Sequence, residues 1–178
     1  MLKKILAALM IPALALTLGA CNRSAKDMNR ITLALSTQTN PFFVELRHGA
    51  QEKAKELDVP LDIQDASDDP AQQVNQLNNA TSMGAKVVIV NPTDSDAVAP
   101  AVRAIANDGV PVIGVDRAVG GVELDSMIAS DNIAGGKQAA HVLADSIEQR
   151  GKILILQGTA GTSASRARGQ GFEEGIAD

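Results

Sequence analysis

Short apolar runs alternate with longer helix-like segments after Arg30, and this alternation constrains the fold more than any other feature of the chain. Most of the runs are β-branched or apolar and are bounded by Gly, Pro, Asn or Asp, which predicts strands. We expect strands at residues 31–36, 60–65, 86–91, 110–116, 126–130 and 152–158. Helices are predicted over residues 41–57, 70–83, 95–107 and 132–149. Repeated strand–helix–strand units predict an α/β fold, a parallel doubly wound sheet with helices on both faces.

Polar and aromatic side chains follow several of the predicted strands. Ligands of such sheets bind outside the carboxyl ends of the strands, because these ends gather at one edge. The residues that follow strand ends are Asn40 with Phe42 and Phe43, Asn91, Asp116 with Arg117, and Arg166 with Arg168. We expect at least the first three groups to line one edge.

These residue types suit a sugar. A hydroxyl group both donates and accepts hydrogen bonds, so carboxylate, guanidinium and amide groups can satisfy it, and flat aromatic rings pack on the C–H faces of a sugar ring. Each group also has a plainer interpretation. The Phe42–Phe43 pair can be a hydrophobic staple, Asp116–Arg117 a strand-end ion pair, and Asn91 a turn residue. Their shared position at strand ends favours binding.

We predict no catalytic residue, no metal site and no cofactor. His48 and His141 lie within predicted helices without metal-ligand spacing, and we expect them to be exposed. The aspartates at residues 65–69 lack the glycine and the closing glutamate of a calcium loop, so a turn is expected there. The sequence has no complete glycine-rich phosphate fingerprint, and its net charge of −5 argues against nucleic acid as a partner.

The N-terminus predicts export. A basic start and an apolar run match a secretory signal over residues 1–20, and the run is shorter than a membrane-spanning helix requires. The run ends at Cys21, the only cysteine, in a setting that resembles a bacterial lipobox and predicts lipidation there. A chance cysteine beside an ordinary cleavage site is the alternative. Residues 21–30 would then be a tether, and the protein would lie in the periplasm or cell envelope.

Several segments resemble a known family as a set. The segments TNPFFVELRHGAQ, NPTDSDAV, VPVIGVDR, IASDNIAGGKQAA and LQGTAGTSASRARGQGF are similar, in this order, to ribose-binding proteins, the type I periplasmic receptors of sugar ABC importers. The resemblance implies ligand contacts by Asn40, Phe42, Phe43, Asn91, Asp116, Arg117 and Arg168. It also implies D-ribose or a similar sugar as ligand, no chemistry on it, and an ABC permease as partner, with a chemoreceptor as a further candidate partner. Related repressors begin with a helix-turn-helix, whereas this chain begins with an export signal.

Members of this family have two lobes joined by three crossovers, with the sugar between them. The resemblance implies a first, sugar-binding lobe over residues 31–130, a crossover near Ser130, and only the start of a second lobe over residues 131–178. We therefore expect a fragment or a prematurely ended product, with weak or absent ribose affinity for residues 22–178. The alternatives are a half-receptor that pairs with another chain and a small sugar- or nucleotide-using enzyme. The exact sugar and the oligomeric state stay open.

Overall fold

The computed structural model describes residues 29–177, and it contains a five-stranded sheet in which all neighbouring strands are parallel. The strand order is β2-β1-β3-β4-β5. The strands are β1 (Arg30–Leu35), β2 (Leu61–Asp65), β3 (Ala85–Val90), β4 (Val112–Val115) and β5 (Ser126–Ile128). The predicted parallel α/β sheet is confirmed, and the carboxyl ends of the strands meet at one edge.

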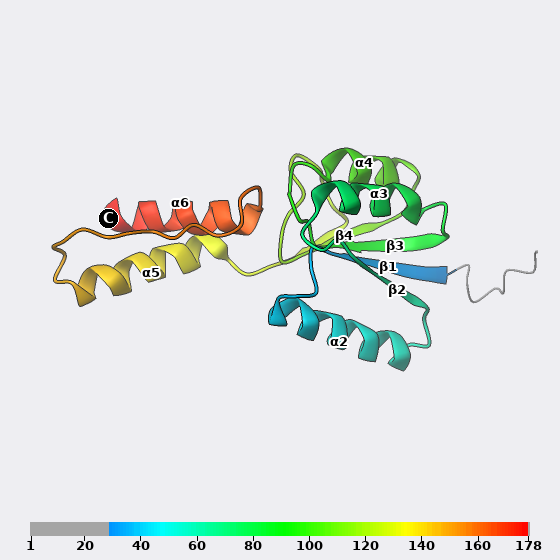
Figure 1. Cartoon of the computed structure of the whole chain (residues 1–178), viewed down its shortest axis with the longest axis horizontal. Helices are drawn as coiled ribbons and strands as arrows, with labels where there is room; N and C mark the ends of the chain where they lie inside the picture. Colours follow the sequence, from blue (N-terminus) through cyan, green and yellow to red (C-terminus); the bar gives the residue numbers. More distant parts are fainter. Residues whose placement is uncertain (1–28, 178) are drawn as a thin grey trace, which may run out of the picture.

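Helices cover both faces of this sheet, as predicted. Helix α2 (Pro41–Glu56) lies on one face, and α3 (Pro70–Ala80) and α4 (Ala99–Asn107) lie on the other (Figure 1). Helix α2 begins where the sequence indicates, because the Asn40 side chain accepts a hydrogen bond from the Phe42 amide at 3.0 Å and Pro41 takes the first helical position. Helix α4 begins four residues later than predicted. The Asp94 carboxylate accepts the amides of residues 96 and 97, which holds that stretch in a turn.

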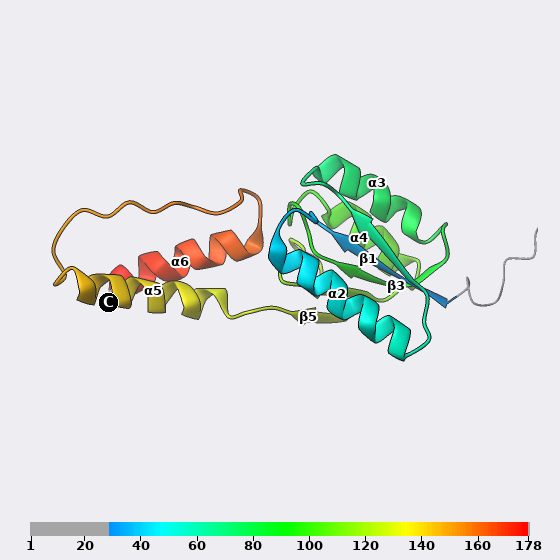
Figure 2. The same ribbon diagram turned by 60° about the horizontal axis from the view of Figure 1, so that its bottom comes forward.

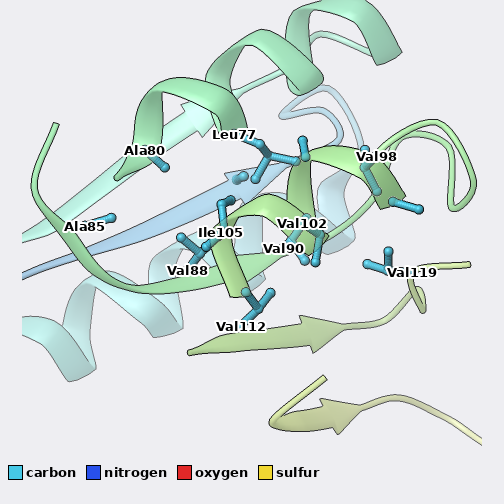
Figure 3. Close-up of a cluster of buried hydrophobic side chains, with 13 residues drawn as sticks. Leu77, Ala80, Ala85, Val88, Val90, Val98, Val102, Ile105, Val112 and Val119 are labelled. Carbon is cyan, nitrogen blue, oxygen red and sulfur yellow. The ribbon is translucent and has the colours of Figure 1, made fainter. Parts of the chain in front are cut away.

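The apolar core lies between the sheet and the helices α3 and α4. Val88 and Val90 of β3 are fully buried beneath Leu77 of α3 and Val102 of α4 (Figure 3). Parallel strands that carry helices on both faces must be apolar on both sides, which explains the continuous VVIV run of β3. This packing fixes the strand ends that carry the predicted site residues.

Beyond the sheet, the chain forms a pair of helices, α5 (Asn132–Ser146) and α6 (Ser163–Ala177), which lie to one side of it (Figures 1 and 2). The helices run in the same direction, since Gly136 lies against Phe172 and Gly175 against Lys137. A Cβ atom added at Gly136 would come 2.8 Å from the Phe172 nitrogen, so the two backbones are in direct contact. Within residues 29–177, none of the helices combines the length and apolar character needed to span a bilayer.

The strand predicted over residues 152–158 is wrong. This segment runs back along the helix pair without regular secondary structure, and Leu154 and Leu156 are 85% and 86% exposed (Figure 2). A strand is stabilised by the hydrogen-bond ladder of a neighbour, and no strand of the described region pairs with this segment. The apolar pattern alone could not reveal the missing neighbour.

The predictions about the N-terminus fall outside the described residues, and the lobe boundary remains a prediction. The signal segment, Cys21 and nearly all of the tether fall within residues 1–28. The lobe boundary is placed by the resemblance alone, although residues 129–131 do connect the sheet to α5, and the Asp131 side chain caps that helix.

Candidate functional site

A cavity of about 330 Å³ opens at the carboxyl edge of the sheet, between the first turn of α2, the loop after β4 and the start of α6. Six of the seven predicted ligand-binding residues line it. These six are Asn40, Phe42, Phe43, Asp116, Arg117 and Arg168. They come from three segments that are far apart in the sequence, and the sheet topology and the loop before α6 bring them together. Direct contact of each residue with a sugar stays a prediction.

The two phenylalanines lie at the same wall but in different environments. Phe43 is 2% exposed and Phe42 is 57% exposed, and their ring centroids are 5.4 Å apart at 73°. Neighbouring residues of a helix point about 100° apart, so one ring can anchor in the protein while the other faces outward. Phe43 is therefore a buried residue that also lines the cavity. Phe42 presents an aromatic surface to solvent.

The loop after β4 brings an acidic and a basic group into the cavity. Asp116 has φ 64°, a left-handed conformation that aspartate tolerates better than most residues. The Arg117 Nε atom lies 3.5 Å from Asp116 Oδ2, and Arg117 Nη1 donates to the Pro92 carbonyl at 2.9 Å. The Arg117 guanidinium also lies over the Phe43 ring, 5.1 Å from its centroid. Both groups are thus held rigidly, and the predicted strand-end ion pair exists within the cavity wall.

Burial lowers the pKa of Arg117, and the Asp116 carboxylate partly opposes this shift. The positive charge of Arg168 adds to the lowering of the Arg117 pKa. An arginine stays charged in proteins, so the cavity offers two sets of strong donors and one carboxylate acceptor. A small polyol can satisfy both kinds of group.

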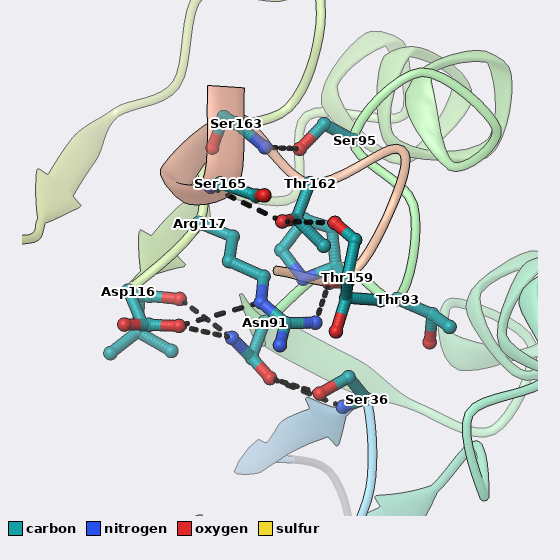
Figure 4. A network of polar contacts seen from close by, with 12 residues as sticks. Ser36, Asn91, Thr93, Ser95, Asp116, Arg117, Thr159, Thr162, Ser163 and Ser165 are labelled. Carbon is teal, nitrogen blue, oxygen red and sulfur yellow. Dashed lines mark hydrogen bonds and ion pairs between the residues drawn. The ribbon is translucent and has the colours of Figure 1, made fainter. Parts of the chain in front are cut away.

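Asn91 is the predicted residue that does not line the cavity. Its side chain is fully buried, and its Oδ1 atom accepts hydrogen bonds from Ser36 Oγ at 2.6 Å and from the Ser36 amide at 3.3 Å (Figure 4). Its Nδ2 atom donates to the Val115 carbonyl at 3.2 Å and to Asp116 Oδ2 at 3.4 Å. Asn91 thus ties β1 to the loop after β4 and orients the Asp116 carboxylate. A direct role in ligand binding stays a prediction.

The cavity also contains hydroxyl groups that the sequence did not single out, from Ser130, Thr159, Thr162 and Ser165. Thr162 Oγ1 accepts the Ser165 amide at 3.3 Å at the start of α6, so the threonine caps that helix. The GTAGTS stretch resembles turn-forming sequence, and its proximity to the cavity depends on how residues 159–163 pack on Ser95 and Ala118. A larger cavity of about 570 Å³ adjoins on the other side of Ser165 and Arg168, lined mainly by α5, α6 and residues 155–158.

The plainer interpretations of the other motifs are consistent with the structure. Asp65 Oδ1 accepts the Ser67 amide and Asp69 caps α3, which confirms a turn followed by a helix start. His48 and His141 are both exposed on helices, as predicted. In the described part of the chain, no three His, Cys, Asp or Glu side chains gather as a metal site would require.

Comparison with known proteins gives consistent results. A family model described as "Periplasmic binding protein domain" matches residues 31–178. The chain is 45% identical over 163 residues to the ribose import binding protein RbsB of Haemophilus influenzae, covering 91% of this chain and 56% of that protein. It is 42% identical over 176 residues to RbsB of Escherichia coli K12, covering 99% of this chain and 58% of that protein.

The solved structures show the same relationship. The Caulobacter myo-inositol binding protein, bound to myo-inositol, matches with a TM-score of 0.80 and 32% identity over 87% of this chain. The match covers 52% of that protein. This chain therefore spans about half the length of the proteins it resembles.

Proposed function

The chain belongs to the periplasmic binding protein domain family, and we propose that it serves as a receptor for D-ribose or a similar sugar. One observation carries the proposal: six side chains from three distant segments, each expected to contact a sugar, line a single cavity. Ribose import binding proteins are among the relatives, and a solved relative holds a cyclic polyol, myo-inositol. The proposed receptor binds its ligand and carries out no chemistry on it.

The cavity chemistry supports a neutral, hydroxyl-rich ligand. Asp116 accepts hydrogen bonds, Arg117 and Arg168 donate them, and the Asn40 amide lies beside Phe42 and Phe43. Hydrogen bonds to charged groups contribute about 1.5–3 kcal/mol each, so a few of them suffice to hold a small sugar. The outward face of Phe42 provides the apolar surface against which C–H groups can pack.

Sugar binding is tested by titrating the full chain with D-ribose and following the backbone amides around the cavity by NMR. We expect saturable shifts at Phe43, Arg117 and Arg168 at ribose concentrations above the micromolar range, because the Phe42 wall of the cavity is open to solvent. An Arg168→Ala variant should weaken the effect. Ribose that causes no saturable shift at these amides up to tens of millimolar would contradict the proposal. A micromolar or tighter dissociation constant would support the function and contradict the expected weak affinity.

We further propose that the receptor is exported, is anchored through a lipid on Cys21, and delivers sugar to an ABC permease, with a chemoreceptor as a second partner. The family and its relatives support export to the periplasm. The lipid anchor rests on the sequence around Cys21. Metabolic labelling with palmitate should mark the expressed chain, and a Cys21→Ser variant should lose the label.

A second candidate function is a half-receptor that pairs with another chain. The exposed Leu154 and Leu156 side chains favour it, since apolar groups of this size are normally covered. Light scattering during size-exclusion chromatography distinguishes the two functions. A monomer at all concentrations would argue against pairing between copies of the chain.

A further inference from the structure

Three loops meet beside the cavity in a network of uncharged hydrogen bonds centred on Ser95. The Ser95 side chain is fully buried, and its Oγ atom accepts the Ser163 amide at 3.0 Å (Figure 4). The Ser95 amide donates to the Gly161 carbonyl at 3.0 Å, and the Ser95 carbonyl accepts the Gly120 amide at 2.7 Å. One residue of the first lobe thus binds both the loop after β4 and the loop that leads into α6.

Ser163 continues this network. Its Oγ atom accepts the Ala118 amide at 2.8 Å, directly after Asp116 and Arg117. The residues on either side of Ser163, Thr162 and Ala164, line the cavity, whereas neither Ser95 nor Ser163 does. Ser95 and Ser163 therefore connect the loop after β4 to the start of α6 without lining the cavity themselves.

The fit between these loops is tight at two glycines. A side chain at Gly161, which has φ +80°, would collide with the Asp94 carboxylate, and one at Gly120 would collide with that of Asp96. Beside them, Arg166 Nη1 lies 3.3 Å from Asp96 Oδ2 in an exposed ion pair, which contributes little in water. The partly buried serine hydrogen bonds, and not this ion pair, therefore fix the position of the loop that leads into α6.

We propose that Ser95 and Ser163 are positioning residues of the cavity: they hold the Arg168-bearing helix against the Asp116–Arg117 loop before any sugar binds. This inference rests on the proposed sugar-binding function for its consequence, since preformed walls reduce the ordering cost of binding. The contact itself requires no ligand. We name the hydrogen-bonded set of Ser95, Ala118, Gly120, Gly161 and Ser163 the serine clasp.

The clasp is tested first without sugar, by hydrogen exchange of the full chain read at single amides by NMR. We expect the amides of Ser95, Ala118 and Ser163 to be protected in the original chain. In Ser163→Ala and Ser95→Ala their exchange should accelerate by about 2- to 12-fold, the range of one lost hydrogen bond. Ser163→Thr keeps the hydroxyl and should restore protection. Ser146→Ala removes a hydroxyl at the far end of α5, 2.7 Å from the Leu143 carbonyl, and is the matched control that should change nothing at the clasp.

The second measurement is D-ribose affinity of the same variants by NMR titration. Ser163→Ala should weaken it several-fold although Ser163 does not line the cavity, and Ser163→Thr should recover it. The clasp proposal is overturned if the three amides exchange without protection in the original chain, or if Ser163→Ala leaves them unchanged. It is equally overturned if the β3 core amides accelerate by the same factor, because the serine would then support the whole fold. If ribose never binds while the clasp amides respond as expected, the clasp stands and the sugar-binding proposal falls.

Discussion

Phe42 and Phe43 show how adjacent residues can divide two tasks. Phe43 is nearly inaccessible and supports the Arg117 guanidinium, whereas Phe42 is more than half exposed at the same cavity. Their position after the first strand could be predicted from the sequence, because a proline and a capping asparagine fix the start of α2. Which of the two is buried could not be predicted, since it depends on how α2 rotates against the sheet.

Alanine substitutions should separate the two tasks. Phe43→Ala should lower the free energy of unfolding by about 3–5 kcal/mol, the usual cost of removing a buried aromatic ring. Phe42→Ala should change it by less than about 1 kcal/mol and should weaken ribose binding by removing apolar contact area. Urea unfolding and ribose titration of both variants provide the test. Equal losses of stability in the two variants would contradict this division.

The left-handed backbone at Asp116 permits a clean test of its charge. Asparagine also tolerates φ near +60°, so Asp116→Asn should keep the loop and its contact with Asn91 while removing the carboxylate. Ribose affinity should fall by about tenfold or more, the effect of losing a charged acceptor. In the original chain the Asp116 charge raises the pKa of Arg117. Without that charge, the pKa of Arg117 should fall further. An unchanged dissociation constant in the NMR titration would exclude Asp116 from the binding surface.

Asn91 marks the limit of prediction at the level of single residues. Its position after β3 was clear from the sequence, because carboxyl strand ends gather at one edge. Its burial was not, because the partners of its amide group are Ser36, directly after β1, and Val115 of β4. Contacts across strands depend on register, which a single strand does not encode.

At the scale of elements, most of the α/β pattern of residues 30–128 was predictable because each strand and helix carries its own local signals. The segment at residues 152–158 has the same apolar signal yet forms no strand, because a strand also needs a neighbour that its own sequence cannot provide. Helices α5 and α6 form without such a neighbour, since helical hydrogen bonds are internal. The late start of α4 reflects a side chain, Asp94, that competes for backbone amides.

The contact between α5 and α6 gives a sharp prediction at this scale. A Cβ atom at Gly171 would collide with the Ile133 carbonyl, whereas Gly169 on the same helix has open space around its Cα. Gly171→Ala should destabilise the helix pair by about 1–3 kcal/mol, the usual cost of overpacking. Gly169→Ala is the matched control and should stabilise α6 by about 0.5–1 kcal/mol, because alanine favours the helix. Thermal unfolding followed by circular dichroism measures both, and a harmless Gly171→Ala would show that the helices are not in backbone contact.

At the scale of the whole molecule, the exposed apolar stretch from Ile153 to Leu156 is the feature least compatible with an isolated monomer. Its two leucines are almost completely exposed. In the described chain, no strand lies in or beyond the helix pair that could form a sheet for α5 and α6 to cover. Burial of apolar area favours association by roughly 25 cal/mol per Å². The chain should therefore associate as its concentration rises.

A double substitution tests this expectation. Leu154→Ser with Leu156→Ser should shift the weight-average mass toward that of the monomer in light scattering, without loss of helical signal in circular dichroism. Leu57→Ser, at an exposed leucine that ends α2, is the matched control and should leave association unchanged. Association that persists at the same concentrations in the double variant would place the contact elsewhere.

The direct backbone contact between α5 and α6 has a mechanical consequence. Because the two helices are in direct contact at their glycines, we expect them to tilt as one unit, and a tilt about residues 129–131 would require the serine clasp to open. A 15-residue helix is about 22 Å long, so a tilt of about 10° displaces the far tip by about 4 Å. A small change of angle near the cavity thus becomes a larger displacement at the far end of α5. Small-angle X-ray scattering is the measurement expected to detect this displacement.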